Sequence, residues 1–331
     1  MENELLFEMQ NAFPMTQRPF KAVAEKLHST EEEVLSLVQK LKDEKIIRQT
    51  SAIFDTKRLG YKSSLVAFKV DKDKVDEAAQ IINAHPGVSH NYLRNHDYNI
   101  WFTMAVSPDS KLGLEKTIEI LKECTGAEDA ITLPTLKMFK ISVKMDTTGK
   151  RAKKEEVKKL AHKEIELTPQ HITVIKELQK DIEVVEEPFK EATLKLGLSY
   201  DDFFTIANEL KESGVMRRFA TILNHRKAGF DANAMSVWAA PEDKGEKIGR
   251  EMAEFSAVSH CYLRPSYPNW PYNLFAMVHA KTQEECDILI EEMAKESGLT
   301  EYGKLYSTVE FKKQRLVYFD DAFEAWEEKA I

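Results

Sequence analysis

Cysteine is scarce in this sequence, with three residues, Cys124, Cys261 and Cys286, among 331. An odd and sparse set without a pair at metal-ligand spacing argues against both a disulfide framework and a zinc site. The first residues lack the basic start and apolar run of a signal peptide, and no segment approaches the roughly 20 apolar residues of a membrane span. We therefore expect reduced thiols in a cytoplasmic protein without membrane contact.

An excess of positive charge is also missing. The 47 Lys and Arg residues are outnumbered by 55 Asp and Glu residues, which gives a formal net charge of -8. Such a balance disfavours non-specific attraction to nucleic acid or to anionic membranes. The one basic run, residues 150–159, also carries two glutamates and few apolar side chains, so we interpret it as a solvated linker.

The sequence does contain a long internal repeat. Val88 to Arg94 reads VSHNYLR, and Val258 to Arg264, 170 residues later, reads VSHCYLR. Each string is followed by a Tyr-Asn pair, and an upstream block from Leu41 matches another from Leu210. Repetition at a nearly constant offset indicates a tandem duplication. Differences between the two copies are then the places to look for function.

Each copy opens with a pattern of three helices and one strand. The third helix of each copy has an N-cap signature, at Ser29-Thr30 and at Ser199. Three helices followed by a strand are the order of a winged helix-turn-helix. The expected elements are 4–11, 19–27, 30–44 and 48–54 in copy one, and 169–178, 188–196, 199–212 and 217–223 in copy two.

The remainder of each copy predicts the order βαββαβ, which is the ferredoxin-like signature. The expected elements are 64–70, 75–84, 88–94, 100–106, 112–123 and 133–143 in copy one, and 235–239, 245–255, 258–263, 274–280, 283–295 and 305–311 in copy two. The predicted fold is α+β, a tandem repeat of a winged helix-turn-helix and a ferredoxin-like domain. Its boundaries are 1–60, 61–147, a linker 148–166, 167–229 and 230–331.

In this element order the chain resembles the Lrp/AsnC transcription regulators. In a helix-turn-helix the start of the third helix faces the bases, and basic residues neutralise phosphates. Here the corresponding residues are Glu31 to Glu33 in copy one and Tyr200 to Asp202 in copy two. Acidic residues there also complement the helix dipole. We therefore expect a regulator's architecture that binds no nucleic acid.

Side chains suited to chemistry are concentrated around the repeated strand. Alternation along a strand puts His90, Tyr92 and Arg94 on one face, and His96 follows just past its end. Imidazoles, a guanidinium and an aromatic ring together suit a planar polyanion such as a carboxylated tetrapyrrole. The alternative is that these histidines only pack in the core, since a shared ancestral feature can be structural.

A second group surrounds the strand that follows each third helix. Arg48 in copy one matches Arg217 in copy two, where Arg218 is added. His225 has Thr56 at its place in copy one, whereas His96 has no counterpart in copy two. If the copies pack as a pseudo-symmetric dimer within the chain, one pocket could draw unequal histidines from both halves. Two separate sites are the alternative.

Taken together, these motifs resemble the siroheme decarboxylases, relatives of Lrp/AsnC proteins in the alternative haem and haem d1 pathways. The similar strings are 48–61 and 87–102 in copy one, and 217–230, 258–264 and 272–273 in copy two. The second copy looks like the partner subunit, so the resemblance covers a fusion of both subunit types. It implies removal of CO2 from the C12 and C18 acetates of sirohaem, giving 12,18-didecarboxysirohaem. It implies no organic cofactor, because the substrate brings its own iron.

The resemblance also implies roles for particular residues. His96 and His225 are the expected catalytic histidines, either as proton donors or as axial contacts to the substrate iron, with His90 and His260 as weaker candidates among the substrate-binding residues. The expected carboxylate anchors are Arg48, Arg94, Arg217, Arg218 and Arg264, and the expected aromatic contacts are Tyr92, Tyr98 and Trp101. In copy two, residues 265–271 replace the turn histidine with three prolines and a Trp, which puts a second equivalent site in doubt.

Two other functions compete with a decarboxylase. One is a tetrapyrrole-responsive regulator without turnover, and the other is an amino-acid-sensing module whose histidines are core residues. The resemblance leaves open whether the product serves haem or haem d1, and whether the chain assembles into a further homo-oligomer.

Overall fold

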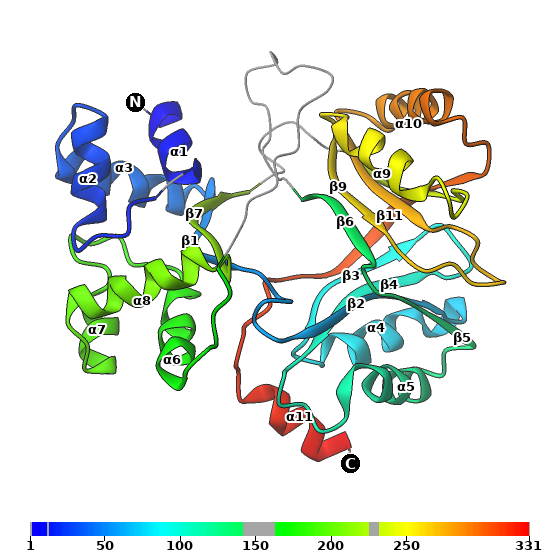
Figure 1. Cartoon of the computed structure of the whole chain (residues 1–331), viewed down its shortest axis with the longest axis horizontal. Coiled ribbons are helices and arrows are strands. Elements are labelled where there is room, and N and C mark those ends of the chain that lie inside the picture. The colour runs from blue at the N-terminus through cyan, green and yellow to red at the C-terminus, as the bar shows by residue number, and fades with distance from the viewer. Residues whose placement is uncertain (1, 12, 142–162, 225–231, 331) are drawn as a thin grey trace. The chain divides into compact units, whose positions relative to one another are not determined.

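The computed structural model describes residues 2–11, 13–141, 163–224 and 232–330. The chain forms two compact units (Figure 1). Unit 1 takes in residues 1–61, 160–227 and 317–320, and unit 2 takes in residues 62–159, 228–316 and 321–331. Both copies contribute to each unit. Within the described residues, no helix has the length and apolar character needed to cross a membrane.

Unit 1 holds the two predicted sets of three helices. These are α1 (Glu2–Asn11), α2 (Pro19–Lys26) and α3 (Glu31–Asp43) from copy one, and α6 (Pro169–Leu178), α7 (Lys190–Leu196) and α8 (Tyr200–Glu212) from copy two. Thr30 and Glu33 form the predicted capping box of α3, and the Ser199 hydroxyl accepts from the Asp202 N–H at the start of α8. The local sequence therefore fixes where both third helices begin.

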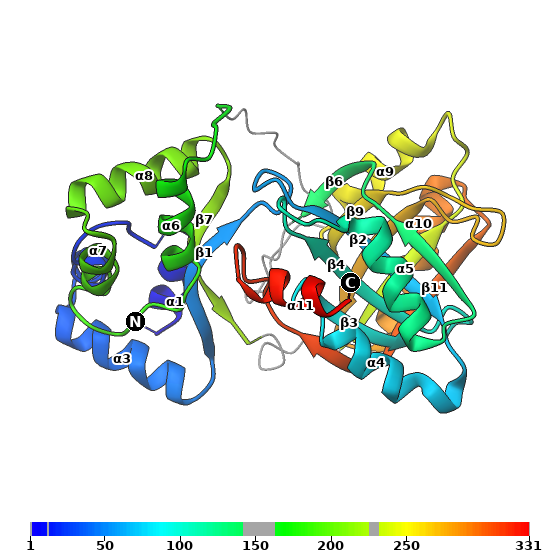
Figure 2. The same ribbon diagram turned by 90° about the horizontal axis from the view of Figure 1, so that it is seen from below.

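The strands that follow these helices pair with each other across the copies. β1 (Ile47–Phe54) and β7 (Met216–Leu223) form a two-stranded antiparallel ribbon (Figure 2). At its centre Thr50 lies opposite Thr221, and their hydroxyls are 2.7 Å apart. The winged-helix strand of each copy thus finds its partner in the other copy.

Unit 2 contains a nine-stranded antiparallel sheet. Copy one supplies β2 (Lys62–Lys69), η1 (Lys72–Lys74), α4 (Val75–Asn83), β3 (Val88–Arg94), β4 (Ile100–Val106), α5 (Gly113–Thr125), β5 (Asp129–Leu133) and β6 (Lys137–Ile141). Copy two supplies β8 (Ala232–Trp238), α9 (Gly245–Glu254), β9 (Val258–Leu263), β10 (Leu274–Ala280), α10 (Gln283–Ser297) and β11 (Tyr302–Lys313). The strand order is β5-β2-β4-β3-β11-β8-β10-β9-β6, which contains two ferredoxin-like sheets and confirms the predicted fold.

The prediction of one continuous strand over 133–143 is wrong within the described residues. The chain instead forms β5 and β6, separated by a break that includes Pro134, which has no N–H to donate to a strand ladder. β5 pairs with β2 of its own copy, whereas β6 pairs with β9 of copy two. In return, β11 pairs first with β8 and then with β3 of copy one. Copy one therefore extends the sheet of copy two with β6, and copy two extends that of copy one with the second part of β11.

A buried and a half-buried lysine reinforce this strand exchange. Lys140 in β6 donates to the carbonyl of Phe255 at 2.9 Å, at the end of α9 in copy two. Lys312 in β11 donates to the carbonyl of Asn83 at 2.8 Å, at the end of α4 in copy one. An ammonium group at a helix C-terminus satisfies open carbonyls and complements the helix dipole. Each exchanged strand thus caps a helix of the other copy.

Apolar side chains in unit 2 form three clusters. Two of them lie between the sheet and its helices, one in each copy. The third combines residues of both copies on the helix-free faces of the strands, so the two halves share a core. Its buried members are Ala67, Tyr98, Trp101, Ile131, Leu133, Met235, Val237, Trp270, Phe275 and Leu305.

A C-terminal helix, α11 (Ala322–Ala330), was not expected from the sequence (Figure 2). Its Trp326 ring lies 4.3 Å from the ring of His85, and its Glu327 accepts hydrogen bonds from Ser110 and Lys111. His85 is 2% exposed, and burial, with Lys312 nearby, lowers its pKa to about 3. The helix thus folds over a neutral histidine.

The buried His85 makes unit 2 sensitive to acid. Because its folded pKa lies below the ordinary 6.5, its contribution to stability is complete above that value and is lost as the pH falls toward 3. This group alone should reduce the free energy of unfolding by about 3 kcal/mol between pH 7 and pH 4. All four tryptophans belong to unit 2, so urea unfolding followed by their fluorescence measures it. His85→Asn keeps an acceptor for Gly87 and should remove this part of the pH dependence. Parallel pH curves for both proteins would contradict the assignment.

Candidate functional site

The predicted stripe on β3 is present. The rings of His90 and Tyr92 have centroids 6.2 Å apart, and the guanidinium carbon of Arg94 lies 5.6 Å from the centre of the Tyr92 ring. These contacts put the three side chains on one face of the strand, as alternation requires. It is the helix-free face, because Trp101, opposite Tyr92 on β4, belongs to the shared core.

Copy two repeats this stripe on β9. His260 and Tyr262 have ring centroids 6.2 Å apart, and the guanidinium carbon of Arg264 lies 4.8 Å from the centre of the Tyr262 ring. The histidines and tyrosines of both stripes are partly exposed, whereas both arginines are buried. The helix-free faces of unit 2 thus carry two equivalent sets of imidazole, phenol and guanidinium groups.

The buried arginines form hydrogen bonds between the two copies. Arg94 is 6% exposed and donates from Nη1 to the carbonyl of Leu305 in β11 at 2.8 Å. Arg264 donates in the same way to Leu133 in β5. Burial lowers the pKa of both guanidinium groups to about 10, so they stay charged near neutral pH. Among the described residues, neither Nε finds a partner. Each arginine retains N–H groups that can donate to a carboxylate. Carboxylate anchoring by these arginines stays a prediction.

His96 lies in the turn after β3, as predicted. Its Nδ1 accepts from the N–H of Tyr98 at 3.1 Å, and its ring lies 6.1 Å from the ring of Tyr98 and 5.2 Å from that of Trp270. Desolvation lowers the pKa of His96, against an opposing effect of Asp97. The ring is therefore mainly neutral near pH 7, with its proton on Nε2.

The insertion in copy two packs against copy one. Trp270 is 1% exposed and contacts Trp101 at a centroid distance of 5.2 Å. The amide of Asn269 donates to Asp129 at 2.8 Å and also to the hydroxyl of Tyr98. The residues that replace a turn histidine in copy two thus pack around the turn histidine of copy one.

Tyr98 and Trp101 are the two predicted aromatic contacts that the fold buries. The Trp101 indole donates to the carbonyl of Tyr98 at 2.6 Å, and the Tyr98 hydroxyl donates to Asp129 at 2.5 Å. Desolvation raises the pKa of the Tyr98 hydroxyl to about 12. Both side chains are positioned to orient His96 and Trp270, and direct contact with a macrocycle stays a prediction.

The remaining predicted arginines belong to unit 1. Arg217 pairs with Asp55 at 2.8 Å, and burial, followed by the charge of Arg217, lowers the pKa of Arg218. Arg48 is exposed near the start of β1, where the register pairs Ile47 with Leu223. The antiparallel ribbon therefore puts Arg48 at the opposite end from Arg217 and Arg218. His225 lies outside the described residues, so the shared-pocket hypothesis stays a prediction.

A hydrogen-bonded network that the sequence did not predict lies next to His260. The hydroxyl of Ser259 lies 2.7 Å from His260 Nδ1 and 2.6 Å from Nε2 of His279, on β10. Alternation along β10 was the available signal, because it puts Phe275, opposite Tyr262, on the same face as His279.

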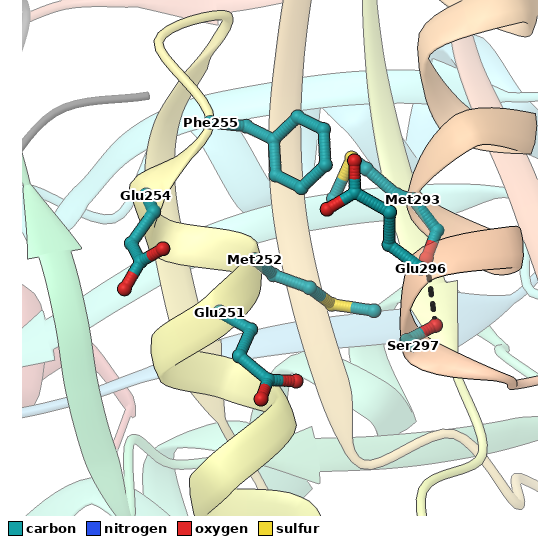
Figure 3. A pocket seen from close by; sticks show the side chains of 7 residues that line it. All are labelled: Glu251, Met252, Glu254, Phe255, Met293, Glu296 and Ser297. Atoms are coloured by element: carbon teal, nitrogen blue, oxygen red, sulfur yellow. Dashed lines mark hydrogen bonds between the residues drawn. The ribbon is translucent and has the colours of Figure 1, made fainter. Parts of the chain in front are cut away.

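A pocket of about 430 Å³ lies between α9 and α10, on the helix-covered side of unit 2 (Figure 3). Three glutamates surround an apolar floor, a lining that disfavours a polycarboxylate. The lining residues are Glu251, Met252, Glu254, Phe255, Met293, Glu296 and Ser297, and none of them is a predicted site residue. Within the part of the chain that the structure describes, no cluster of three or more His, Cys, Asp or Glu side chains could hold a metal ion.

Comparisons with known proteins first define the class. Residues 58–140 and 227–312 match the AsnC-like ligand binding domain. Residues 2–48 and 172–217 match the siroheme decarboxylase NirDL-like HTH domain. The chain is thus a tandem pair of helix-turn-helix and AsnC-like domains, the Lrp/AsnC type of architecture.

Individual relatives narrow the class to one family. A siroheme decarboxylase of Hydrogenobacter thermophilus is 41% identical over 99% of this chain and 98% of its own length. The crystal structure of the siroheme decarboxylase NirDL in co-complex with an iron-uroporphyrin III analogue covers 100% of this chain and 98% of its own, with 36% identity and a TM-score of 0.80. A siroheme decarboxylase beta subunit of Methanosarcina barkeri is 41% identical over 43% of this chain and 93% of its own length. The chain belongs to the siroheme decarboxylase family, and it combines in one polypeptide two repeats of the size of such a subunit.

The contact between Trp270 and His96 is open to a direct test. Trp270→Ala should reduce the free energy of unfolding by about 3–5 kcal/mol, since it empties a buried site. It should also raise the pKa of His96 toward its ordinary value, because part of the desolvation disappears. Trp326→Ala, which removes a ring that packs on His85, is the control and should leave the pKa of His96 unchanged. NMR titration of the His96 ring measures the effect, and an unchanged titration in Trp270→Ala would refute it.

Proposed function

We propose that this chain removes CO2 from the C12 and C18 acetate side chains of sirohaem, giving 12,18-didecarboxysirohaem. The observation that carries this proposal is the pair of equivalent stripes, His90 to Arg94 and His260 to Arg264, on the helix-free faces of unit 2. They combine cations for carboxylates, flat rings for a macrocycle and imidazoles for proton transfer. Membership of the family supports the same substrate.

The chemistry explains why no organic cofactor is proposed. Each step breaks the bond between the acetate methylene and its carboxylate, CO2 leaves with the carboxylate oxygens, and one proton completes the new methyl group. The step consumes a proton and no redox equivalent, which makes the protein a carbon-carbon lyase. The iron and the macrocycle belong to the substrate. The protein must hold the carboxylate, exclude water and supply the proton.

The described residues divide these tasks. His90 and His260 are partly exposed on the stripes, so they can reach a bound macrocycle, and His96 adds a mainly neutral imidazole beside Trp270. Arg94 and Arg264 contribute positive charge from buried positions. We assign carboxylate anchoring to these two arginines, and the resemblance alone supports the same role for Arg48, Arg217 and Arg218.

We further propose that nucleic acid is not a ligand and that the protein is cytoplasmic. Glu31 at the start of α3 pairs with Arg18, and Glu33 caps the same helix. These acidic residues therefore stabilise the helix start, and their negative charge would repel phosphates. The three cysteines are free thiols, as a reducing compartment favours. Assembly of the chain into a homo-oligomer is compatible with this proposal and is not required by it.

The first test is anaerobic incubation of the purified chain with sirohaem, followed by mass spectrometry of the extracted tetrapyrrole. We expect the loss of two CO2 units. In deuterated water each new methyl group should carry one deuterium, because its last hydrogen comes from a solvent-exchangeable group. Sirohaem that binds with a shifted Soret band but keeps its mass would instead support a tetrapyrrole-responsive regulator, and DNA binding would then be measured.

The catalytic histidines can be tested one at a time. His96→Gln and His225→Gln should each abolish turnover, since each removes an imidazole that the proposal assigns to proton transfer or iron contact. Sirohaem titration followed at the Soret band provides the control for binding. Full turnover in either variant would remove that histidine from the mechanism.

A further inference from the structure

The hydroxyl of Ser259 joins two histidines. It lies 2.7 Å from Nδ1 of His260 and 2.6 Å from Nε2 of His279, both within normal hydrogen-bond range. A serine hydroxyl has one hydrogen to donate and accepts others. When it donates to one imidazole, it accepts the N–H of the other. The protonation of the two rings is therefore linked through this single oxygen.

The equivalent place in copy one lacks the second histidine. Ser89 lies 3.0 Å from Nδ1 of His90, and its hydroxyl contacts that of Thr103 at 2.7 Å. A threonine hydroxyl is not protonated near neutral pH, so Thr103 cannot supply a proton to Ser89 as an imidazolium could. The two copies thus share a serine and a histidine on the helix-free face. They differ in the second partner of the serine, which is Thr103 in copy one and His279 in copy two.

The strands beside the two histidines differ as well. His260 faces Met277 on β10 and Ile141 on β6, both apolar. His90 faces Thr103 on β4 and Lys313 on β11, and the ammonium of Lys313 lies 3.7 Å from Glu310. The copy-two histidine therefore has apolar neighbours across both strands, and Ser259 connects it to a titratable group.

We propose that His279 and Ser259 act as positioning residues that relay a proton to His260, so that the copy-two half supplies the proton for decarboxylation. This role rests on the proposed function. Among the described residues, the hydroxyl of Ser89 contacts Thr103 in place of a second histidine, so copy one holds the substrate without such a relay.

The relay balances as a shift of three hydrogens. His279 begins as the imidazolium, the Ser259 hydroxyl donates to His260 Nδ1, and His260 is neutral with its hydrogen on Nε2. As the carbon-carbon bond breaks and CO2 leaves, the electron pair on the methylene carbon takes the hydrogen from His260 Nε2. The Ser259 hydrogen moves to His260 Nδ1, and the hydrogen on His279 Nε2 moves to Ser259. His260 is neutral before and after, so the positive charge is stored on His279, which Ser259 and His260 separate from the reacting carbon.

Turnover under anaerobic conditions tests the relay with a control in each copy. His279→Gln keeps a side-chain donor for Ser259 but cannot hold a proton, and Ser259→Ala breaks the connection. Each should lower kcat at least tenfold and leave sirohaem affinity, followed at the Soret band, within about threefold. Ser259→Thr keeps the hydroxyl and should recover most of the rate. Thr103→Val removes the hydroxyl that Ser89 contacts in copy one and should change kcat by less than about threefold.

Several outcomes would overturn the relay. One is a His279→Gln enzyme with the wild-type rate, and another is an equal loss in Thr103→Val. The solvent isotope effect gives a further criterion: the wild type should show a proton inventory with more than one hydrogen in flight, and Ser259→Ala should show one. A single-hydrogen inventory in the wild type would contradict the proposal.

A spectroscopic measurement separates failure of the relay from failure of the proposed function, because it requires no turnover. Nitrogen-15 NMR of the imidazoles in the full chain reports which ring nitrogen carries hydrogen. His279→Gln should change the tautomer or protonation of His260 when Ser259 is present and should have no such effect in the Ser259→Ala background. Equal responses in both backgrounds would show that Ser259 does not couple the rings.

Discussion

The exchange of C-terminal strands between the two copies is the constraint on which unit 2 depends. β6 of copy one pairs with β9 of copy two, and the second part of β11, beyond the part that pairs with β8 of its own copy, pairs with β3 of copy one. Arg94 of copy one binds the carbonyl of Leu305 in copy two, and Arg264 of copy two binds that of Leu133 in copy one. Their guanidinium groups are buried, which is costly unless the hydrogen bonds are made. The arginines that flank the candidate site therefore also hold the two halves together.

The two copies form nearly symmetric halves of unit 2, and the proposed function depends on the residues in which the halves differ. The repeated stripes give both halves the same imidazole, phenol and guanidinium. The insertion in copy two then puts Trp270 beside His96, and β10 puts His279 behind Ser259. In this way the two halves of a duplicated binding face can come to have different functions. One half surrounds a neutral histidine with aromatic rings, and the other connects a histidine to a second titratable group.

The sequence predicted the features that local patterns encode. Capping residues located the third helices, and period-two alternation put His90, Tyr92 and Arg94 on one face. Strand exchange was beyond such patterns, because the partner of β6 lies more than 100 residues away. Burial of Arg94 was missed since a charged residue is ordinarily exposed, and α11 was missed since it has no counterpart within the described residues of copy one. His279 was missed because it is an isolated polar residue in an apolar strand. Its contact with Ser259 becomes visible only when the neighbouring strand is placed beside it.

The exchanged strands also bear on what the covalent connection between the copies contributes. A half of unit 2 that is missing its partner would lack one strand at the edge of its sheet and would leave Arg94 or Arg264 without its carbonyl. Folding and association are then one event, as in obligate dimers whose protomers have no separate stability. Carrying both copies on one polypeptide keeps the halves at a fixed stoichiometry and makes assembly independent of dilution. A single chain also allows the two halves to diverge without the risk that either pairs with a second copy of itself.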